Sequence, residues 1–284
     1  LTLGNDPSTG FGQLLGEIGE VLIFDRLLSQ SEKEKVEGYL AHKWGIVPDL
    51  AGNSYKIKNG LVLYYPFEEA DGTTIQDASP ELRNAVLQEG NLNTSGKFGS
   101  GLEFDDSEQT KINLGLNQLA LPTNWTISTW FTTPLVGDHV LLTHALVSGG
   151  ANAHVIFDKG GAKELGVYDG GDFMTTFGAS SLSAGWHHLV AIGNGGQTSF
   201  WVDGVAVGSV NANVASAIEA IGNHTGGFGR FSDKIDDFRI YSRTLGVSEV
   251  DELFGAGDGD FGAHPYSINS PVFDNSPEIL LPNN

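Results

Sequence analysis

Closely spaced carboxylates are the first residues in this sequence that could do chemistry. The segment EFDDSE, Glu103–Glu108, has the E-x-D-x-x-E spacing with which a glycosidase places a nucleophile and an acid on one strand face. The run Asp106–Gln109 is polar and turn-like, however, and a turn cannot hold two carboxylates at a fixed separation across a sugar. We therefore expect no catalysis, and a glycoside hydrolase is the least favoured interpretation.

Histidine and tryptophan supply the next candidates. His187 and His188 are adjacent, and adjacent strand residues point to opposite faces, so the pair cannot chelate one zinc ion. Trp130, Trp186 and Trp201 could stack on sugar rings, but each lies inside an apolar run typical of a buried strand. We expect structural roles for the histidines and core positions for most of these tryptophans.

Aromatic residues in Gly-rich loops are better candidates for binding a ligand. Phe173, Phe228 and Phe231 lie in such segments. Loops carry binding residues more often than buried strands do. We predict that these three phenylalanines line a ligand-binding rim.

The composition excludes several classes of function. Of 284 residues, 35 are acidic and 15 are basic, and the net charge of -20 repels nucleic acids and anionic membranes while favouring hard cations such as calcium. The chain has no cysteine, which excludes disulfides and thiol chemistry. No apolar run approaches the roughly 18 residues that a membrane helix requires. We expect neither a nucleic-acid partner nor a membrane span.

An internal repeat indicates the domain organisation. The segment GEIGEVLIFDRLLSQSEK aligns without gaps on DKIDDFRIYSRTLGVSEV, 217 residues further along, so that Arg26 and Glu32 match Arg243 and Glu249. Each copy is predicted to be a strand followed by a short helix, because alternating apolar residues give way to a Ser-led capping pattern. A period of this length fits a whole domain.

We therefore divide the chain into four parts. Residues 1–47 are the C-terminal strand and helix of an upstream domain, 48–57 a linker, 58–256 a complete domain, and 257–284 a Gly/Pro-rich tail. Within the complete copy, short apolar runs recur between turn signals with hardly any helix, which predicts an all-β, antiparallel sandwich. The runs begin at Leu61, Thr126, His139, His154, Leu165, Trp186, Thr198 and Ile235.

The sequence resembles the laminin-G-like, concanavalin-A-like jelly-roll superfamily, specifically the LamG-type modules of bacterial surface proteins. The matching pieces, in family order, are GLVLYYPFEEADGTTIQDASP, SGKFGSGLEFDD, NWTISTWF, AGWHHLVAI, FWVDGVAVG and KIDDFRIYSRTLGVSEVDELF. The resemblance implies an antiparallel two-sheet jelly-roll sandwich with short peripheral helices, in an extracellular or cell-surface protein. Family members bind carbohydrate or protein partners, and the fold also hosts glycosidases.

The resemblance also implies a structural calcium ion. The family holds it with an acidic residue after the first strand and another on the last strand, and these positions correspond to Asp77 and Asp236. Oxygen ligands from distant chain segments suit calcium, whose coordination number of roughly six to eight would be completed by carbonyls and water. The alternative is that both residues are solvated turn carboxylates.

Our leading functional hypothesis is a non-catalytic structural or adhesive module of an extracellular, tandem-LamG protein. A calcium-dependent, carbohydrate-binding lectin is the second, and a protein or glycan on a surface is the expected partner of either. Residues 1–47 would expose the apolar Val21, Ile23 and Val36. This part is therefore expected to dock on an upstream segment of a longer chain or, by strand addition, on a neighbouring subunit, which would produce self-association into filaments.

Overall fold

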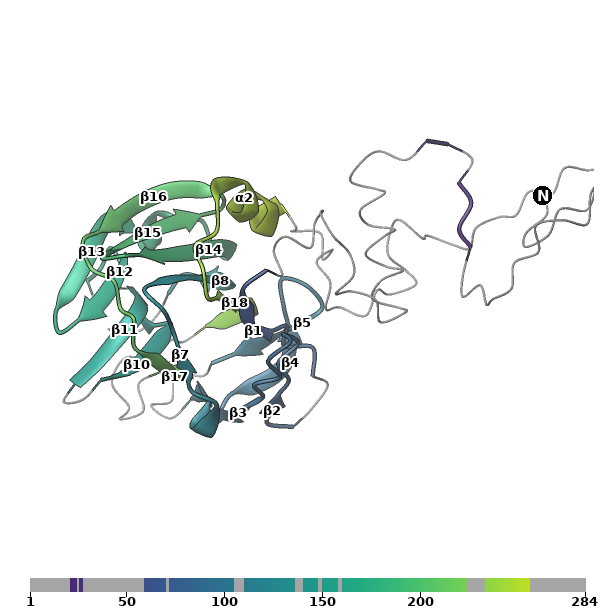
Figure 1. Ribbon diagram of the computed structural model, residues 1–284, viewed down its shortest axis with the longest axis horizontal. Coiled ribbons are helices and arrows are strands. Elements are labelled where there is room, and N and C mark those ends of the chain that lie inside the picture. The colour runs from purple at the N-terminus through teal and green to yellow at the C-terminus, as the bar shows by residue number, and fades with distance from the viewer. Residues whose placement is uncertain are drawn as a thin grey trace, which may run out of the picture. The chain divides into compact units, whose positions relative to one another are not determined.

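The chain divides into two units, residues 1–53 with 265–284, and residues 54–264. The secondary-structure elements of the described residues all belong to the second unit (Figure 1). The computed structural model describes residues 21–24, 26–27, 59–69, 72–104, 110–135, 140–147, 150–157, 160–223 and 233–255.

In the first unit, the described residues include Val21–Phe24. They have no regular secondary structure, so the strand predicted there is absent at these positions. Val21 and Ile23 are exposed. Val36, the rest of residues 1–47 and the tail 257–284 lie outside the described residues.

One sheet, here called sheet A, contains eight antiparallel strands among the described residues. Its centre is formed by β8 and β14, which are ten residues long and mostly buried, because apolar, aromatic and β-branched side chains cover both of their faces. The strands in spatial order are β16 (Val205–Val210), β15 (Gln197–Val202), β14 (Gly185–Asn194), β8 (Asn124–Thr133), β18 (Lys234–Tyr241), β5 (Ser100–Glu103) and β4 (Asn91–Ser95), with β1 (Leu61–Tyr65) also paired to β18.

The second sheet, sheet B, contains ten described strands, again antiparallel. Short single-turn helices lie outside it at η3 (Gly115–Asn117) and η4 (Ala179–Ser181). The strands in spatial order are β13 (Asp172–Gly178), β12 (Glu164–Asp169), β11 (Gly150–Phe157), β10 (Thr143–Val147), β17 (Ala217–Ile221), β6 (Lys111–Asn113), β3 (Ala85–Gln88) and β2 (Thr74–Ile75), with β7 (Leu119–Ala120) paired to β17 and β9 (Val140–Leu141) paired to β11.

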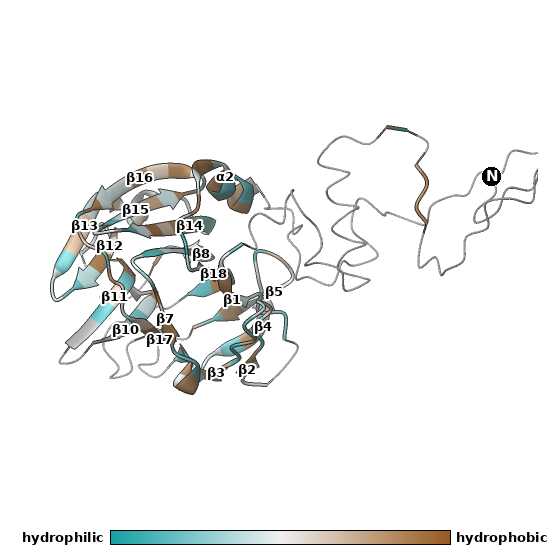
Figure 2. Ribbon diagram, viewed as in Figure 1, coloured by the Kyte–Doolittle hydropathy of each residue, from teal (hydrophilic) through white to brown (hydrophobic). Residues whose placement is uncertain are grey.

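A continuous hydrophobic core lies between the two sheets. Its fully buried members include Tyr65, Phe131 and Phe200 from sheet A and Phe157 and Leu165 from sheet B. Hydrophobic residues are interspersed with hydrophilic ones along the strands, as expected when one face of each strand is buried (Figure 2). The predicted all-β, antiparallel sandwich with short peripheral helices is confirmed.

A smaller hydrophobic cluster lies on the outer face of sheet A. Val190 of β14 and Tyr241 of β18 contact Val250 and Leu253 of the helix α2 (Val247–Gly255). Each of these four side chains is at most 1% exposed. The helix therefore gives sheet A a second buried face, which is why its central strands are apolar on both sides.

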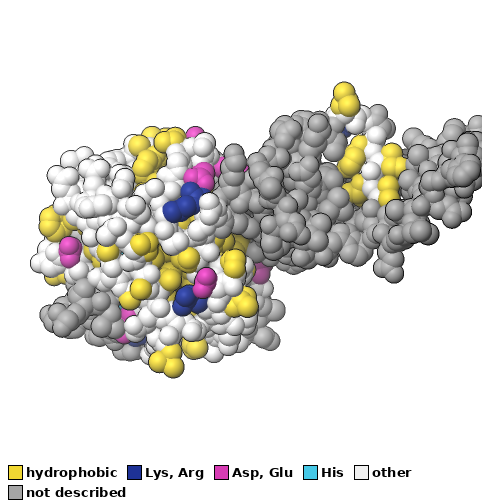
Figure 3. Space-filling view, in the orientation of Figure 1, with side chains coloured by type: hydrophobic (Ala, Val, Ile, Leu, Met, Phe, Trp, Pro, Cys, Tyr) yellow, Lys and Arg dark blue, Asp and Glu magenta, His cyan; other side chains and the backbone are white. Residues whose placement is uncertain are grey.

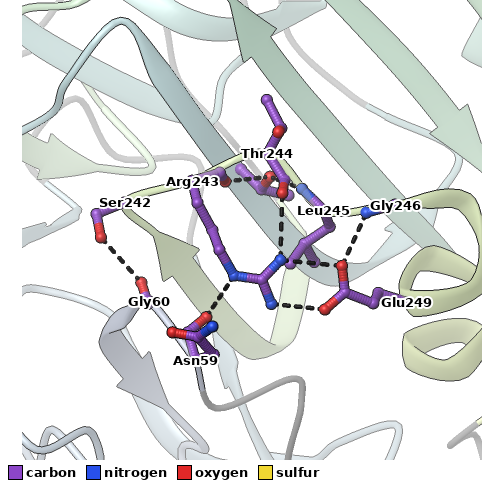
Figure 4. Close-up of polar contacts among 9 residues, drawn as sticks. Asn59, Gly60, Ser242, Arg243, Thr244, Leu245, Gly246 and Glu249 are labelled. Atoms are coloured by element: carbon purple, nitrogen blue, oxygen red, sulfur yellow. Dashed lines mark hydrogen bonds and ion pairs between the residues drawn. The ribbon is translucent and has the colours of Figure 1, made fainter.

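Arg243 forms hydrogen bonds that link the first and the last elements of the sandwich domain (Figure 4). Its Nη1 and Nη2 atoms donate to Glu249 at 2.9 and 2.5 Å, and its Nε donates to the carbonyl of Asn59 at 2.6 Å. Glu249 also accepts the N–H of Gly246 at 2.8 Å and so caps α2. The contacts join the end of β18, the start of α2 and the turn before β1. Arg243 and Glu249 are two of the residues that recur in the internal repeat, so the repeat includes a packing motif.

Replacing Arg243 with Lys should lower the free energy of unfolding by about 1–2 kcal/mol, because lysine keeps the charge but loses the forked contact with Glu249. Urea unfolding measures the change. The matched control is Arg83→Lys, because Arg83 Nη2 contacts Glu81 at 3.3 Å between two partly exposed side chains, and a change within about 0.5 kcal/mol is expected there. Equal losses at both positions would contradict the role assigned to Arg243.

Candidate functional site

Surface charge does not by itself mark a site on this domain. On the face drawn in Figure 3, the acidic side chains of the sandwich are dispersed among hydrophobic and uncharged ones, and some lie beside basic side chains. Buried ionisable groups are more informative, because a protein interior retains a charge only where a partner or a ligand compensates for it.

Strand β18 contains a bulge that gathers its charged residues on one face. Asp236 lies opposite Trp130 of β8 and Arg239 lies opposite Ser128, so β18 has one residue more than β8 over this interval. Asp237 lies within the bulge with a φ of 55°, which is uncommon for a residue other than glycine. Because Trp130 and Ser128 point to the same face of β8, Asp236 and Arg239 also share that face, the outer face of sheet A.

Arg239 and Asp237 form a buried ion pair on this face. Arg239 Nη2 donates to Asp237 Oδ1 at 2.8 Å and to the Tyr64 hydroxyl at 3.3 Å, and the guanidinium lies 4.5 Å from the centre of the Tyr64 ring. Burial disfavours the charged guanidinium, but Asp237, Tyr64 and Tyr241 together more than compensate, and the pKa of Arg239 is raised. Asp237 is therefore engaged in an ion pair and is a poor candidate for binding a ligand.

Asp236 is a fully buried carboxylate with an unsatisfied atom. Its Oδ2 accepts the N–H of Phe98 at 2.8 Å, whereas its Oδ1 has no hydrogen-bond partner among the described residues. Burial raises the pKa of Asp236 to about 8. The N–H groups of Phe98 and Asp237 oppose this increase, and the charges of Asp237 and Glu68 reinforce it. An ionised Asp236 would be stabilised by a cation at Oδ1.

Glu68 approaches the same turn, residues 96–100 between β4 and β5. Both oxygens of its carboxylate accept the N–H of Ser100, at 3.2 and 3.3 Å. Two glycines allow the carboxylates to approach the turn this closely. A Cβ on Gly99 would lie 2.6 Å from the Glu68 carboxylate, and a Cβ on Gly96 would lie 2.7 Å from the Asp236 carboxylate. Two carboxylates thus bind one glycine-rich turn, and we call this group the Glu68–Asp236 site.

The structure places Asp77, the other predicted calcium ligand, in a different role. Its carboxylate accepts four hydrogen bonds, from the N–H groups of Tyr64, Ser79 and Arg83 and from the Ser79 hydroxyl, at 2.7–2.8 Å. It shares no hydrogen-bond partner with Asp236. Both oxygens of Asp77 are saturated by the chain around it, so the geometry favours Glu68 as the companion of Asp236.

The donor set of the Glu68–Asp236 site fits calcium. The described residues contain no group of three or more His, Cys, Asp or Glu side chains that could hold a metal ion. Calcium, however, accepts backbone carbonyls and water beside carboxylates, and the unsatisfied Oδ1 of Asp236 is the kind of oxygen it binds. Glu68 and Asp236 would hold the ion, which would neutralise their charges and fix the turn between them.

The predicted aromatic rim cannot be assembled from the described residues. Phe173 lies on β13, opposite Val167 of β12, and is 40% exposed. Phe228 and Phe231 lie outside the described residues. Phe173 is thus an exposed aromatic side chain at the edge of sheet B, and its role in binding stays a prediction.

The two adjacent histidines and Glu103 have partners within the sandwich. His187 Nδ1 lies 2.7 Å from Asp203 Oδ2, whereas His188 Nε2 lies 2.9 Å from the Ser128 hydroxyl, so the two rings have separate partners, as strand geometry predicts. Glu103 lies in β5 opposite Lys234 of β18. Residues 105–108 of the EFDDSE segment lie outside the described residues. In the described part of the chain, no helix is long and apolar enough to cross a membrane.

Residues 106–251, just over half of the chain, match the family Laminin_G_3, described as the concanavalin A-like lectin/glucanases superfamily. The matched range includes β8, β14 and β18, which carry the outer face of sheet A. No curated protein sequence matches the chain.

Two solved structures show the same fold. Domain 4 of AbnA, a GH43 extracellular arabinanase from Geobacillus stearothermophilus in complex with arabinotriose, has 20% identity and a TM-score of 0.55, over 68% of this chain and 97% of that domain. Trypanosoma rangeli sialidase has 17% identity and a TM-score of 0.53, over 81% of this chain but 39% of the sialidase. The chain therefore spans a whole domain in the first case and well under half of the protein in the second.

Calcium should raise the melting temperature of the protein, and Asp236→Asn should abolish that increase by removing the charge that binds the ion. At a calcium concentration 100 times the dissociation constant, the expected stabilisation is about 2.7 kcal/mol. Asp77→Asn is the matched control: it should lower the melting temperature with and without calcium but leave the calcium-induced shift intact. Thermal melts in EDTA, calcium and magnesium measure these effects. If calcium leaves the melting temperature of the wild-type protein unchanged, the assignment of a calcium site is wrong.

Proposed function

Because the chain belongs to the concanavalin A-like lectin/glucanases superfamily, we propose that it is a non-catalytic carbohydrate-binding module of a secreted or cell-surface protein. The observation that carries this proposal is the match to nearly the full length of the AbnA domain, whose structure contains arabinotriose. The shared fold supplies an analogy, and the residues of a particular site have to supply the binding itself.

The coverage of the two similar proteins supports a binding module rather than a complete enzyme. The chain corresponds to one domain of a multidomain arabinanase and to 39% of the sialidase. Glu103, the described carboxylate of the EFDDSE segment, lies in β5 between Asn91 of β4 and Lys234 of β18.

Calcium has a structural role in this proposal. The ion would bind between Glu68 and Asp236 and order the turn 96–100, whose N–H groups already contact both carboxylates. Binding of a glycan beside this turn would then depend on calcium through the order that the ion gives to the turn.

A glycan array is the direct test of carbohydrate binding. The wild-type protein should bind a restricted set of neutral oligosaccharides, with arabinotriose included as one probe, and should release no reducing sugar from them. Phe173→Ala is a variant to compare: a loss of binding would include this exposed side chain in the rim, and unchanged binding would exclude it. Absence of binding to any glycan, with and without calcium, would contradict the proposal.

A structural or adhesive module in a tandem array is the second candidate function. The observation in its favour is the recurrence in the first copy of Arg26 and Glu32, which match the Arg243–Glu249 contact of the complete domain. In this proposal residues 1–47 belong to a second copy of the module and dock on a neighbouring subunit.

Light scattering of the full chain tests this docking. Self-association through residues 1–47 predicts a mass that rises with protein concentration, together with protection of this segment from proteolysis. A monomer at all concentrations would exclude the intermolecular version. A monomer with the segment still protected would indicate docking within the chain.

A further inference from the structure

Three neighbouring strands place three buried polar side chains in one row on the outer face of sheet A. Asp236 of β18 and His188 of β14 both lie directly opposite Trp130 of β8. Their side chains are 0%, 1% and 3% exposed, respectively. Each has one polar atom without a hydrogen-bond partner among the described residues: Asp236 Oδ1, His188 Nδ1 and Trp130 Nε1. We call these three residues the outer-face row.

Such atoms are unusual, because a buried donor or acceptor that loses water without gaining a partner destabilises the fold. Calcium at the Glu68–Asp236 site accounts for Asp236 Oδ1 only. The indole N–H of Trp130 is a donor and cannot bind a cation. Burial lowers the pKa of His188 to about 3, so its ring is neutral at physiological pH, and its Nε2 is already paired with Ser128. Two nitrogens therefore remain that calcium does not explain.

A single side chain from α2 covers these two nitrogen-bearing rings. The ring of Phe254 stacks on Trp130, with centroids 5.9 Å apart and planes at 26°, and on His188, at 6.1 Å and 24°. On the side of the β4–β5 turn, Lys97 Nζ lies 4.4 Å from the centre of the Trp130 ring and Phe98 meets that ring edge-on. A sugar ring, although not planar, has an apolar C–H face that can pack on the same aromatic surfaces.

Phe254 is less buried than the residues that anchor α2. Val250 and Leu253, which anchor α2 in the small hydrophobic cluster, are 0% and 1% exposed, whereas Phe254 is only partly buried. It also lies in the last turn of α2, where helical hydrogen bonding is incomplete.

We propose that the outer-face row is a sugar-binding site that Phe254 closes in the ligand-free protein. The inference rests on the proposed carbohydrate-binding function and adds to it the location of the site and the residue that regulates it. The ligand takes the place of the Phe254 ring, with the apolar face of a neutral sugar against Trp130 and His188. One hydroxyl oxygen accepts the Trp130 N–H, another hydroxyl donates to His188 Nδ1, and a third donates to Asp236.

The decisive variant is Phe254→Ala, tested on a glycan array of neutral oligosaccharides with and without calcium. Opening the site removes the competition from Phe254, so binding should strengthen by about tenfold. Val247→Ala, at a position 63% exposed in the first turn of the same helix, is the matched control and should bind like the wild type. Adding Trp130→Phe to Phe254→Ala keeps an aromatic ring but deletes the donor, and should reverse the gain.

The indole N–H signal of Trp130 gives a structural readout. In nitrogen–proton NMR spectra it is identified by its absence in Trp130→Phe, and it should shift when a bound glycan is added to either the wild type or Phe254→Ala. Melting curves of all variants confirm that they are folded.

The outcomes separate this inference from the proposed function. If the wild type binds a glycan and neither Phe254→Ala nor Trp130→Phe changes the affinity, the sugar binds elsewhere, Phe254 is an anchor of α2, and the inference is wrong. If the wild type binds nothing but Phe254→Ala binds, the outer-face row binds sugar only when Phe254 is removed: the inference stands, whereas carbohydrate binding as the function of the wild-type protein fails. If neither binds any glycan, both the inference and the proposed function fail.

Discussion

The arrangement of the outer face of sheet A depends on one extra residue in β18. In a regular strand, residues three apart point to opposite faces. The bulge at Asp237 places Asp236 and Arg239 on the same face, and it requires a φ of 55° from a residue that is not glycine. Without it, either Asp236 would leave the row with Trp130 or Arg239 would enter the core between the sheets.

The same bulge explains why α2 can cover a face that contains charged side chains. Apolar contacts of Val250 and Leu253 stabilise the docked helix, whereas Arg239 is compatible with burial because Asp237 and Tyr64 pair with it. A buried ion pair adds little net stability, but removal of one partner costs about 3–5 kcal/mol because the other charge is left uncompensated. The ion pair therefore fixes how β18 and α2 fit together more than it strengthens the domain.

Much of the fold could be predicted from the sequence, because long strands with a buried face have a clear apolar pattern. The apolar runs at Thr126, Trp186 and Ile235 became β8, β14 and β18, the centre of sheet A. Strands β13 and β16 had no such pattern, since both lie at sheet edges and most of their side chains are exposed or half-buried. The internal repeat identified Arg243 and Glu249, but only the structure showed that they pair with each other.

The candidate site was harder to predict, because its chemistry depends on which carboxylate oxygens the fold leaves unsatisfied. Asp77 and Glu68 both follow β1, and sequence position alone does not distinguish them as partners for Asp236. In the structure Asp77 accepts hydrogen bonds from three nearby residues, so it cannot bind a cation without giving them up. Glu68 instead reaches the turn that also binds Asp236. A ligand site is recognised by a buried donor or acceptor atom that lacks a partner. Such an atom can be identified only after every hydrogen bond around the group has been assigned.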